Sequence, residues 1–453
     1  MNDMILMIVI IIALLLVTLA IGAPVSGSMG FTAVVCMAAF VGLSFVPSFA
    51  TTAYGQVVSS NQLIAPLFIM MAEFLTRGNI AQDIYYVLNK YLKKLKGGLA
   101  LSTTIACTIF AALCGSSPAT AAAIGKVSID EMIKRRYRRS FAIGTVAGGG
   151  TLGIMIPPSL TFVQFGILTE TSIVKLLMAG LLPGIMLAVM MCISVVIRVR
   201  LNPALIGDDS KANRGGRFAL DEEQQNTIPN EMDLKKTTLG QDLKLALPAC
   251  ALIVVVIGCM YTGVATPTEA AGFGVLGAIL ILLLMKRFTG KVFLNAMVAT
   301  TGTSSMMLFM MITGLCLSQV ITRLGIASDL ASMIITLGLN RWVVMLILYI
   351  LWFILGMLMS PGSMVVLTIP FVFPTLTALG FDPLWIGVVS TLCVEIGMIT
   401  PPVGLNLFIL KNTTGAEMKT IIKGALPYVV VLLLGLAILN VFPQIATVIP
   451  NSM

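Results

Sequence analysis

Histidine does not occur in the 453 residues of this chain. Its absence excludes the Ser–His and Cys–His pairs of nucleophilic enzymes and any metal site that depends on imidazole. Cysteine occurs eight times, scattered through apolar segments with no C-x-x-C pair, so we expect small packing residues and no disulfide framework. The sequence therefore predicts a protein that is not an enzyme and has no cofactor.

A nucleotide-binding loop is also missing. The pattern G-x-x-x-x-G-K-[ST] holds the phosphates of ATP, but Gly125-Lys126 and Gly290-Lys291 are each followed by valine and lack the upstream glycine. ATP hydrolysis by that route is excluded. An ion gradient remains as the energy source within this polypeptide.

Charged residues are scarce. Asp, Glu, Lys and Arg make up 10% of the chain, against roughly 25% in ordinary globular proteins. Apolar runs near the roughly 20 residues that cross a bilayer recur, for example residues 4–21, 173–197, 245–264 and 425–441. The composition predicts an all-α polytopic membrane protein in a lipid bilayer. The net charge of +9 is explained by basic residues in the loops that are expected on the cytoplasmic side, so it does not predict a nucleic-acid partner.

Two pairs of interrupted apolar segments occur, one pair in each half of the chain. Residues 114–120 read CGSSPAT and residues 150–159 read GTLGIMIPPS, while residues 359–363 read MSPGS and residues 397–406 read GMITPPVGLN. Pro118 and Pro158 are 40 residues apart, and Pro361 and Pro402 are 41 apart. In lipid, non-helical backbone is tolerated only where it is buried in protein or faces a water-filled cavity. Paired breaks of this kind point to the binding site of a transporter.

Basic residues set the expected orientation of the first half. Four lysines precede residues 99–132 and five basic residues follow them, so both ends of this segment belong on the cytoplasmic side. A re-entrant helical hairpin with its tip at residues 115–118 satisfies this condition, and a simple crossing does not. Residues 1–200 thus form a first repeat with these elements: spans at 4–21, 29–46 and 63–75, an amphipathic surface helix at 84–95, the hairpin, a broken transmembrane helix at 140–168 and a span at 173–197.

The second half is expected to repeat this order upside down. A polar cytoplasmic connector at residues 201–243 leads into the second inverted repeat, residues 244–453. Its elements are spans at 245–264, 269–285 and 294–321, an amphipathic helix at 328–339, a periplasmic-side hairpin at 342–376, a broken transmembrane helix at 384–410 and a last span at 425–441. The two re-entrant hairpins would have opposite orientations. The same reasoning places both termini in the periplasm of a bacterium with the protein in its inner membrane.

The breaks carry groups that bind ions. Free N–H groups at a helix start attract a carboxylate, and free carbonyls with hydroxyls coordinate Na⁺. Such hydroxyls or amides are supplied by Ser116, Ser117, Thr120, Ser360, Ser363, Thr151, Thr400 and Asn406. We expect one cation site where each hairpin tip meets its broken span, with the substrate between the two. The structural alternative is that these small residues only let helices pack closely.

Three acidic residues lie in apolar context. Glu395, five residues before Thr400, is a candidate coupling acid in a cation site or a proton relay, with a structural role equally open. For Glu269 and Glu73 we favour structural roles. Glu269 can cap a helix with Thr266 or Thr268 as its partner.

The motifs around these residues resemble a known family, the large membrane subunit of the tripartite ATP-independent periplasmic (TRAP) transporters. The matching segments read GGLALST at 97–103, GSSPATAA at 115–122, GTLGIMIPPS at 150–159, ATPTEAA at 265–271 and ITPPVGLNLF at 399–408. The resemblance covers nearly the whole chain. It implies sodium-driven import of organic acids such as C4-dicarboxylates or sialic acid by an elevator movement of an inverted-repeat fold. It also implies two partners, a periplasmic substrate-binding protein and a small four-helix membrane subunit.

The resemblance also assigns candidate site residues. Sodium ligation, largely through backbone carbonyls, would fall on Gly115, Ser116, Ser117, Gly153, Ile156, Ser360, Gly362, Ile399, Thr400 and Val403. Substrate binding would fall on Ser117, Pro118, Thr120, Pro158, Ser159, Gly362, Ser363, Pro402 and Asn406. The nearest alternative is a stand-alone sodium/anion symporter with the same two hairpins. A channel subunit or a membrane enzyme is a more distant one.

Overall fold

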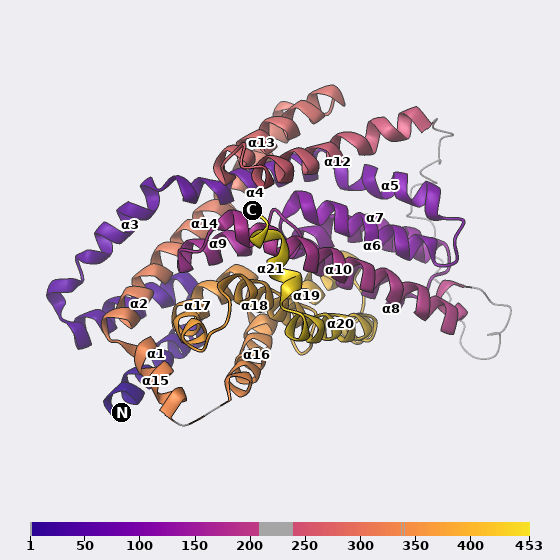
Figure 1. Ribbon diagram of the computed structural model, residues 1–453. Coiled ribbons are helices and arrows are strands. Elements are labelled where there is room, and N and C mark those ends of the chain that lie inside the picture. The colour runs from indigo at the N-terminus through magenta and orange to yellow at the C-terminus, as the bar shows by residue number, and fades with distance from the viewer. Residues whose placement is uncertain (1, 208–238, 337, 339) are drawn as a thin grey trace.

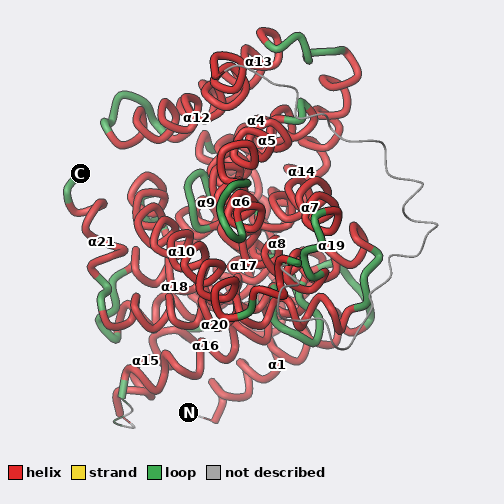
Figure 2. The backbone as a smooth tube through the Cα atoms, turned by 90° about the vertical axis from the view of Figure 1, so that its right-hand side faces the viewer, coloured by secondary structure: helices red, strands yellow, loops and turns green. Residues whose placement is uncertain are grey.

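The computed structural model describes residues 2–207, 239–336, 338 and 340–453, and its elements are helices joined by loops (Figures 1 and 2). The first half contains α1 (Asn2–Ala20), α2 (Val25–Cys36), α3 (Ser48–Val58), α4 (Ile64–Arg77), α5 (Ile80–Leu92), α6 (Gly98–Cys114), α7 (Ser117–Lys134), α8 (Arg139–Gly150), α9 (Leu160–Thr169) and α10 (Ile173–Leu201). The second half contains α12 (Leu239–Tyr261), α13 (Pro267–Leu284), α14 (Gly290–Arg323), α15 (Ile326–Thr336), α16 (Arg341–Leu358), α17 (Pro361–Ala378), α18 (Pro383–Met398), α19 (Leu405–Thr414), α20 (Met418–Val441) and α21 (Gln444–Asn451).

Many of these helices can cross a membrane. In the described part of the chain, seven are long and apolar enough, namely α10, α12, α13, α14, α16, α17 and α20. The fold is therefore that of an all-helical polytopic membrane protein, as expected. The expected span at residues 29–46 is wrong in extent. Its apolar helix covers Val25–Val41, closing in a π-helical turn (Met37–Val41) before Gly42, whose φ is +130°.

Helix α3 was not expected. The sequence predicts no element at residues 47–62, between the expected spans at 29–46 and 63–75. In the structure this segment is helical, and Ser59 is extended, so that residues 43–58 and 60–77 form a pair of helical pieces bent by 59°. If the pair is one span, the number of candidate spans rises to eight. The expected span at residues 63–75 is thus the second arm of a longer bent element.

Proline and glycine determine where both hairpins turn. Helix α6 ends at Gly115, whose φ of +62° is the left-handed conformation that glycine adopts without strain. Helix α7 begins with Pro118 in its first turn, where a missing N–H costs nothing. Helices α16 and α17 meet in the same way at Ser360 and Pro361, with Ser360 capping α17. These two helix–turn–helix elements lie at the predicted positions.

The two interrupted helices also lie where the sequence places them. Helix α8 gives way at Thr151 to a 3₁₀ turn, η4 (Thr151–Ile154), and α9 starts at Leu160. Helix α18 ends at Met398, and α19 starts after Gly404, whose φ is +63°. Each break holds a Pro–Pro pair with a cis peptide bond, Pro157–Pro158 and Pro401–Pro402. Proline cannot continue a helix at these points, because its N–H is missing and its ring clashes with the preceding turn.

Packing pairs elements from the two halves. Helix α4 packs on α13, and α2 packs on α14. Deeper in the molecule, α7 packs on α19 and α9 on α17, while α10, α18 and α20 lie side by side (Figure 2). A smaller apolar core, with Ile11, Met29 and Leu317, joins α1, α2, α14 and α15. The segments around both breaks belong to the larger core.

Helix α5 is tied to the second half by ion pairs. Arg287, just after α13, binds the Asp83 carboxylate with both terminal nitrogens and donates to the Gly78 carbonyl at 2.9 Å. Asp242, at the start of α12, accepts hydrogen bonds from Lys90 and Tyr91. Helix α5 also packs on α6 of the first hairpin. The expected amphipathic surface helix thus contacts protein on two sides.

We expect Arg287→Gln to destabilise the protein by about 2 kcal/mol, because it leaves a mostly buried carboxylate without its cation. The Asp83 side chain is only 14% exposed. Burial raises the pKa of Asp83, although the hydrogen bond and charge of Arg287 lower it. Thermal unfolding of the purified protein in detergent measures the change. The control is Arg77→Gln in the exposed Glu73–Arg77 pair, which should cost less than about 0.5 kcal/mol. Equal losses would contradict a structural role for the Asp83–Arg287 pair.

Most of the predicted connector, residues 201–243, lies outside the described residues, which stop at Gly207 and resume at Leu239. Its described ends are a 3₁₀ turn (Pro203–Ile206) and the first turn of α12. Helix α21 at the other end of the second half was not expected. It is a short helix that packs on α10 and α18 after the last long helix ends at Val441.

Candidate functional site

The first hairpin tip packs directly on the first break. A Cβ atom added to Gly115 would clash with the carbonyl oxygen of Pro158. A Cβ atom added to Gly153 would lie 2.6 Å from both the carbonyl carbon of Ser116 and the amide nitrogen of Ser117. Backbone touches backbone here, so only glycine fits at either position. The candidate ligands of the first cation site are therefore adjacent in space.

The second tip meets the second break in a similar way. The Gly404 N–H donates to the Met357 carbonyl near the end of α16, at 3.0 Å. One turn earlier, Gly356 of α16 and Gly397 of α18 approach so closely that a Cβ on either would touch the other helix's backbone. The Ser360 hydroxyl accepts from the Ser363 N–H and lies 2.7 Å from the Ser363 hydroxyl.

The first tip also reaches the broken helix of the other half. The Ser117 hydroxyl donates to one carboxylate oxygen of Glu395, 278 residues away on α18. Both residues are completely buried. The second carboxylate oxygen of Glu395 has no hydrogen-bond partner among the described residues. We expected Ser117 to face its own break, so this contact between the halves is additional information from the structure.

A residue that the sequence did not single out lies at the second tip. Gln164 of α9 is 2% exposed, and its amide lies against Gly362, where a Cβ would clash with the Gln164 oxygen. Its amide nitrogen has no partner in the described part of the chain. The sequence contains a sign of this residue's importance. Gln164 is a polar side chain in the apolar run that follows the first break, and polar side chains inside membrane segments are often functional.

Two further buried polar side chains lie on the elements of the second break. Asn406 of α19 is completely buried and neither atom of its amide has a partner among the residues described. Thr391, one turn before Glu395 on α18, has an unpartnered hydroxyl. A buried polar group without a partner costs about 1–3 kcal/mol, so these side chains are candidates for binding an ion, a water molecule or a ligand.

Backbone carbonyls at the breaks are unpaired as well. Six of the predicted sodium-site residues have carbonyl oxygens that accept no hydrogen bond from the described residues, namely Gly115, Gly153, Ile156, Ile399, Thr400 and Val403. By contrast, the Ser116 carbonyl accepts from Thr120, and the Ser360 carbonyl accepts from the Met364 N–H. Hard cations prefer oxygen ligands, and a carbonyl that accepts no hydrogen bond has both lone pairs available for one.

Most of the predicted hydroxyl ligands make local hydrogen bonds. Thr151 donates to the Gly148 carbonyl and Thr400 to the Ile396 carbonyl, each within its own helix end. Ser159 caps α9 by accepting from the Phe162 N–H. The two threonine bonds use the hydroxyl proton and leave the oxygen lone pairs, and the Ser159 oxygen has a second lone pair besides the one that accepts, so local bonding and ion binding are compatible.

The two breaks differ in exposure. Residues 151–159 of the first break, with Pro158 among them, are all buried. In the second break Thr400, Pro401 and Val403 are half-buried and Pro402 is exposed. At the tips, Ser116 and Pro118 are half-buried, as are Ser360 and Gly362, whereas Thr120 and Ser363 are buried. The site is therefore accessible through the tips and the second break.

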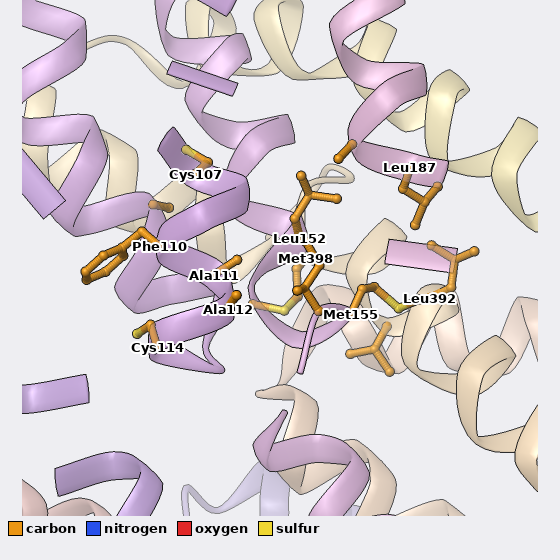
Figure 3. Close-up of a cluster of buried hydrophobic side chains, with 14 of the residues drawn as sticks. Cys107, Phe110, Ala111, Ala112, Cys114, Leu152, Met155, Leu187, Leu392 and Met398 are labelled. Carbon is orange, nitrogen blue, oxygen red and sulfur yellow. The ribbon is translucent and has the colours of Figure 1, made fainter. Parts of the chain in front are cut away.

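An apolar cluster fills the space between the breaks (Figure 3). Leu152 and Met155 of the first break lie beside Met398, the last residue of α18, with Ala111 and Ala112 of α6 next to them (Figure 3). The cluster keeps water out of the region where the two broken helices meet. Polar atoms there are thus held in a low-dielectric setting.

The other two acids have structural roles, as expected. Glu269 completes a capping box with Thr266 at the start of α13. Glu73 pairs with Arg77 one turn along α4, with nitrogen and oxygen 2.9 Å apart. The eight cysteines are all free thiols.

Comparisons with known proteins agree with this architecture. The family model described as "Tripartite ATP-independent periplasmic transporter, DctM component" matches residues 12–445. The C4-dicarboxylate TRAP transporter large permease protein DctM of Pseudomonas aeruginosa is 34% identical over 392 residues, 86% of each chain. The ectoine TRAP transporter large permease protein TeaC of Halomonas elongata is 30% identical, over 85% of this chain and 84% of that one.

Two more similarities add to these. The isethionate TRAP transporter permease protein DctMQ of Oleidesulfovibrio alaskensis is 28% identical over 94% of this chain and 64% of its own length. The crystal structure of the Alcanivorax borkumensis YdaH transporter shares the fold, with a TM-score of 0.59 at 15% identity over 89% of each chain. The match over nearly the whole length means that this multi-pass membrane protein belongs to the DctM family, the large permeases of TRAP transporters, and is not an enzyme.

Proposed function

We propose that this chain imports a carboxylate-bearing solute across the bacterial inner membrane, driven by sodium, as the large subunit of a TRAP transporter. The observation that carries the proposal is the contact of the first hairpin tip with the other half's broken helix, through Ser117 and Glu395. It joins the first hairpin tip, which packs on the first break, to the broken helix of the other half in one buried polar region. The chain contains no nucleotide-binding loop, so a coupled ion supplies the energy.

Two sodium sites are assigned to the tips. The first uses the free carbonyls of Gly115, Gly153 and Ile156, and the second those of Ile399, Thr400 and Val403. The Ser116, Ser117, Ser360 and Gly362 groups complete the sets. Glu395 is the coupling acid, because its second oxygen is available and its negative charge would offset a bound cation without solvent.

The substrate carboxylate is assigned to the space between the tips. Helices α7, α9, α17 and α19 all begin at the tips or breaks, and their first N–H groups attract an anion. Asn406 supplies an unpaired amide, and Gln164 joins Pro118, Thr120, Pro158, Ser159, Ser363 and Pro402 in the proposed binding set. Carboxylates and compatible solutes are the range that relatives' names cover, with C4-dicarboxylate and ectoine among them.

The mechanism follows as an elevator movement of an inverted repeat. Residues 1–200 and 244–453 each contain a hairpin, a broken helix and a long helix in the same order. Contacts between the halves have counterparts in which the halves are swapped. The packing of α7 on α19 corresponds to that of α17 on α9, and the packing of α4 on α13 corresponds to that of α14 on α2. The hairpins and broken helices would move as one body against the remaining helices, with hairpins of opposite orientation and both termini periplasmic.

Two partner proteins complete the proposed transporter. A small four-helix membrane subunit is supported by the relative named DctMQ, because this chain covers 64% of that protein and leaves a further part of it unmatched. A periplasmic binding protein would deliver the solute, as the name of the matching family model implies.

Uptake into proteoliposomes tests the proposal. We expect labelled solute, from a panel of carboxylates and compatible solutes, to accumulate only when the small subunit, the binding protein and an inward sodium gradient are all present. Removing the gradient while keeping a matched potassium gradient should abolish accumulation. Sodium-driven uptake without any binding protein would instead support the stand-alone symporter. Uptake that does not depend on the sodium gradient would overturn the proposal.

A further inference from the structure

A second polar cavity lies away from the hairpin tips. It has a volume of about 360 Å³ and is lined by Leu315 and by the polar residues Thr52, Glu170, Ser318, Gln319, Thr322 and Arg323. They come from α3, the turn between α9 and α10, and the last turns of α14, and α14 packs on both α3 and α9. A volume near 300 Å³ is enough for a small organic solute. We call it the Arg323 cavity.

The guanidinium group of Arg323 is available to bind a carboxylate. Its guanidinium lies over the Phe45 ring, 4.7 Å from the centroid, and it has no carboxylate within ion-pair distance in the described part of the chain. This cation–π contact leaves the N–H donors of Arg323 without a hydrogen-bond partner among the described residues. A planar guanidinium with free edges binds a carboxylate through two parallel hydrogen bonds.

The rest of the cavity is built from neutral hydrogen-bonding groups and one acid. The Gln319 amide nitrogen donates to the Thr52 hydroxyl at 2.7 Å, which orients the amide, and its buried oxygen has no partner among the described residues. Glu170 contributes a carboxylate from the α9–α10 turn. The cavity thus presents a cation and an anion from different elements, without an ion pair between them.

We propose that the Arg323 cavity is a separate binding site for a small zwitterionic carboxylate. The carboxylate of the ligand pairs with Arg323, and its cationic group faces Glu170. A dicarboxylate binds less well, because its second charge meets Glu170. The inference rests on the proposed function in taking a carboxylate-bearing solute as the ligand, and it adds a charge requirement that the site at the tips does not impose.

We place the Arg323 cavity before the hairpin tips on the path of the solute. Glu170 is the first residue after α9 and follows Gln164 by six positions, five of which lie on α9, so the two are about 9 Å apart along the helix axis. Gln164 in turn contacts Gly362 at the second tip. By the charge-based orientation, the Arg323 end of α14 is periplasmic. Arg323 and Glu170 are both exposed, so a solute can reach them from outside before it meets the second tip.

Protection of a single cysteine tests the site locally. Ser318→Cys is introduced into a cysteine-free background, in complex with the small subunit in nanodiscs, and its labelling rate with an impermeant maleimide is measured in sodium-free buffer. We expect saturating ectoine, a zwitterion, to slow labelling at least about fivefold and equimolar succinate to have little effect. A cysteine at Ser328 on α15, outside the cavity, should label at the same rate with or without ectoine.

Charge variants then separate the proposed contacts. Arg323→Gln should raise the ectoine concentration for half-protection at least about tenfold, and Glu170→Gln should let succinate protect as well as ectoine. The matched control is Lys175→Gln, which removes an exposed positive charge near Glu170 but does not line the cavity, and it should change nothing. Protection that needs sodium, or that survives Arg323→Gln, would overturn the inference. Since no uptake is measured, a failure of sodium-coupled import would leave this result interpretable.

Discussion

A Gly153→Ala variant should be inserted in the membrane and yet show uptake reduced at least about 100-fold, because the added methyl group displaces the first hairpin tip. The Cβ atom would lie 2.6 Å from two backbone atoms of the Ser116–Ser117 peptide, which cannot rotate away as a side chain would. The tip would have to move away, and the free carbonyls of Gly115 and Gly153 would separate. A misplacement of about 1 Å is enough to cost two orders of magnitude in rate.

Uptake into proteoliposomes as a function of sodium concentration measures the effect, with protein content normalised. The matched control is Gly258→Ala in α12, where a Cβ atom would meet nothing within 4 Å. It should transport like the unmodified protein and gain a little helix stability. If Gly153→Ala transports normally, the tip and the first break do not form one rigid site.

The second large effect is expected for Glu395→Gln. The amide has nearly the shape of the carboxylate and can still accept from the Ser117 hydroxyl, so the packing of the buried residue is preserved. What it loses is the negative charge. We expect the sodium concentration for half-maximal uptake to rise at least about tenfold, because a bound cation would no longer be offset within the low-dielectric region.

Two further variants isolate the charge. Ser117→Ala removes the hydrogen bond but keeps the charge, and we expect only about a threefold rise in the half-maximal sodium concentration. Glu73→Gln removes an acid that pairs at the surface of α4, and it should leave sodium dependence unchanged. An unaltered sodium response in Glu395→Gln would assign this acid a purely structural role.

The sequence predicts well those features that proline, glycine and serine determine locally. Both hairpin turns and both breaks could be located because proline favours the first turn of a helix, as at Pro118 and Pro361, and because the two Pro–Pro pairs interrupt one. The capping box at Glu269 is local too, and it was expected for the same reason. Such residues act on the backbone next to them, whatever the rest of the fold does.

Contacts between the halves could not be predicted in this way. The Ser117–Glu395 bond joins residues 278 positions apart, and nothing near either residue specifies the other. Gln164 was missed because a single amide in an apolar run resembles ordinary packing until its neighbour is known. Helix α3 was missed because its threonines and serine favour loops locally, while tertiary context makes the segment helical.

Helix α5 is attached to the second half by two ion pairs, and in the proposed elevator movement these would limit how far the first hairpin moves. Ion pairs at Asp83 and Asp242 anchor this helix to the segments beside α12 and α13, and it packs on α6. Residues 93–97 are then the only non-helical link between the anchored helix and the hairpin. Five extended residues span at most about 17 Å. In the proposed elevator movement, this link would set the upper limit of the distance that the first hairpin moves relative to α5, and a shorter link would reduce that distance.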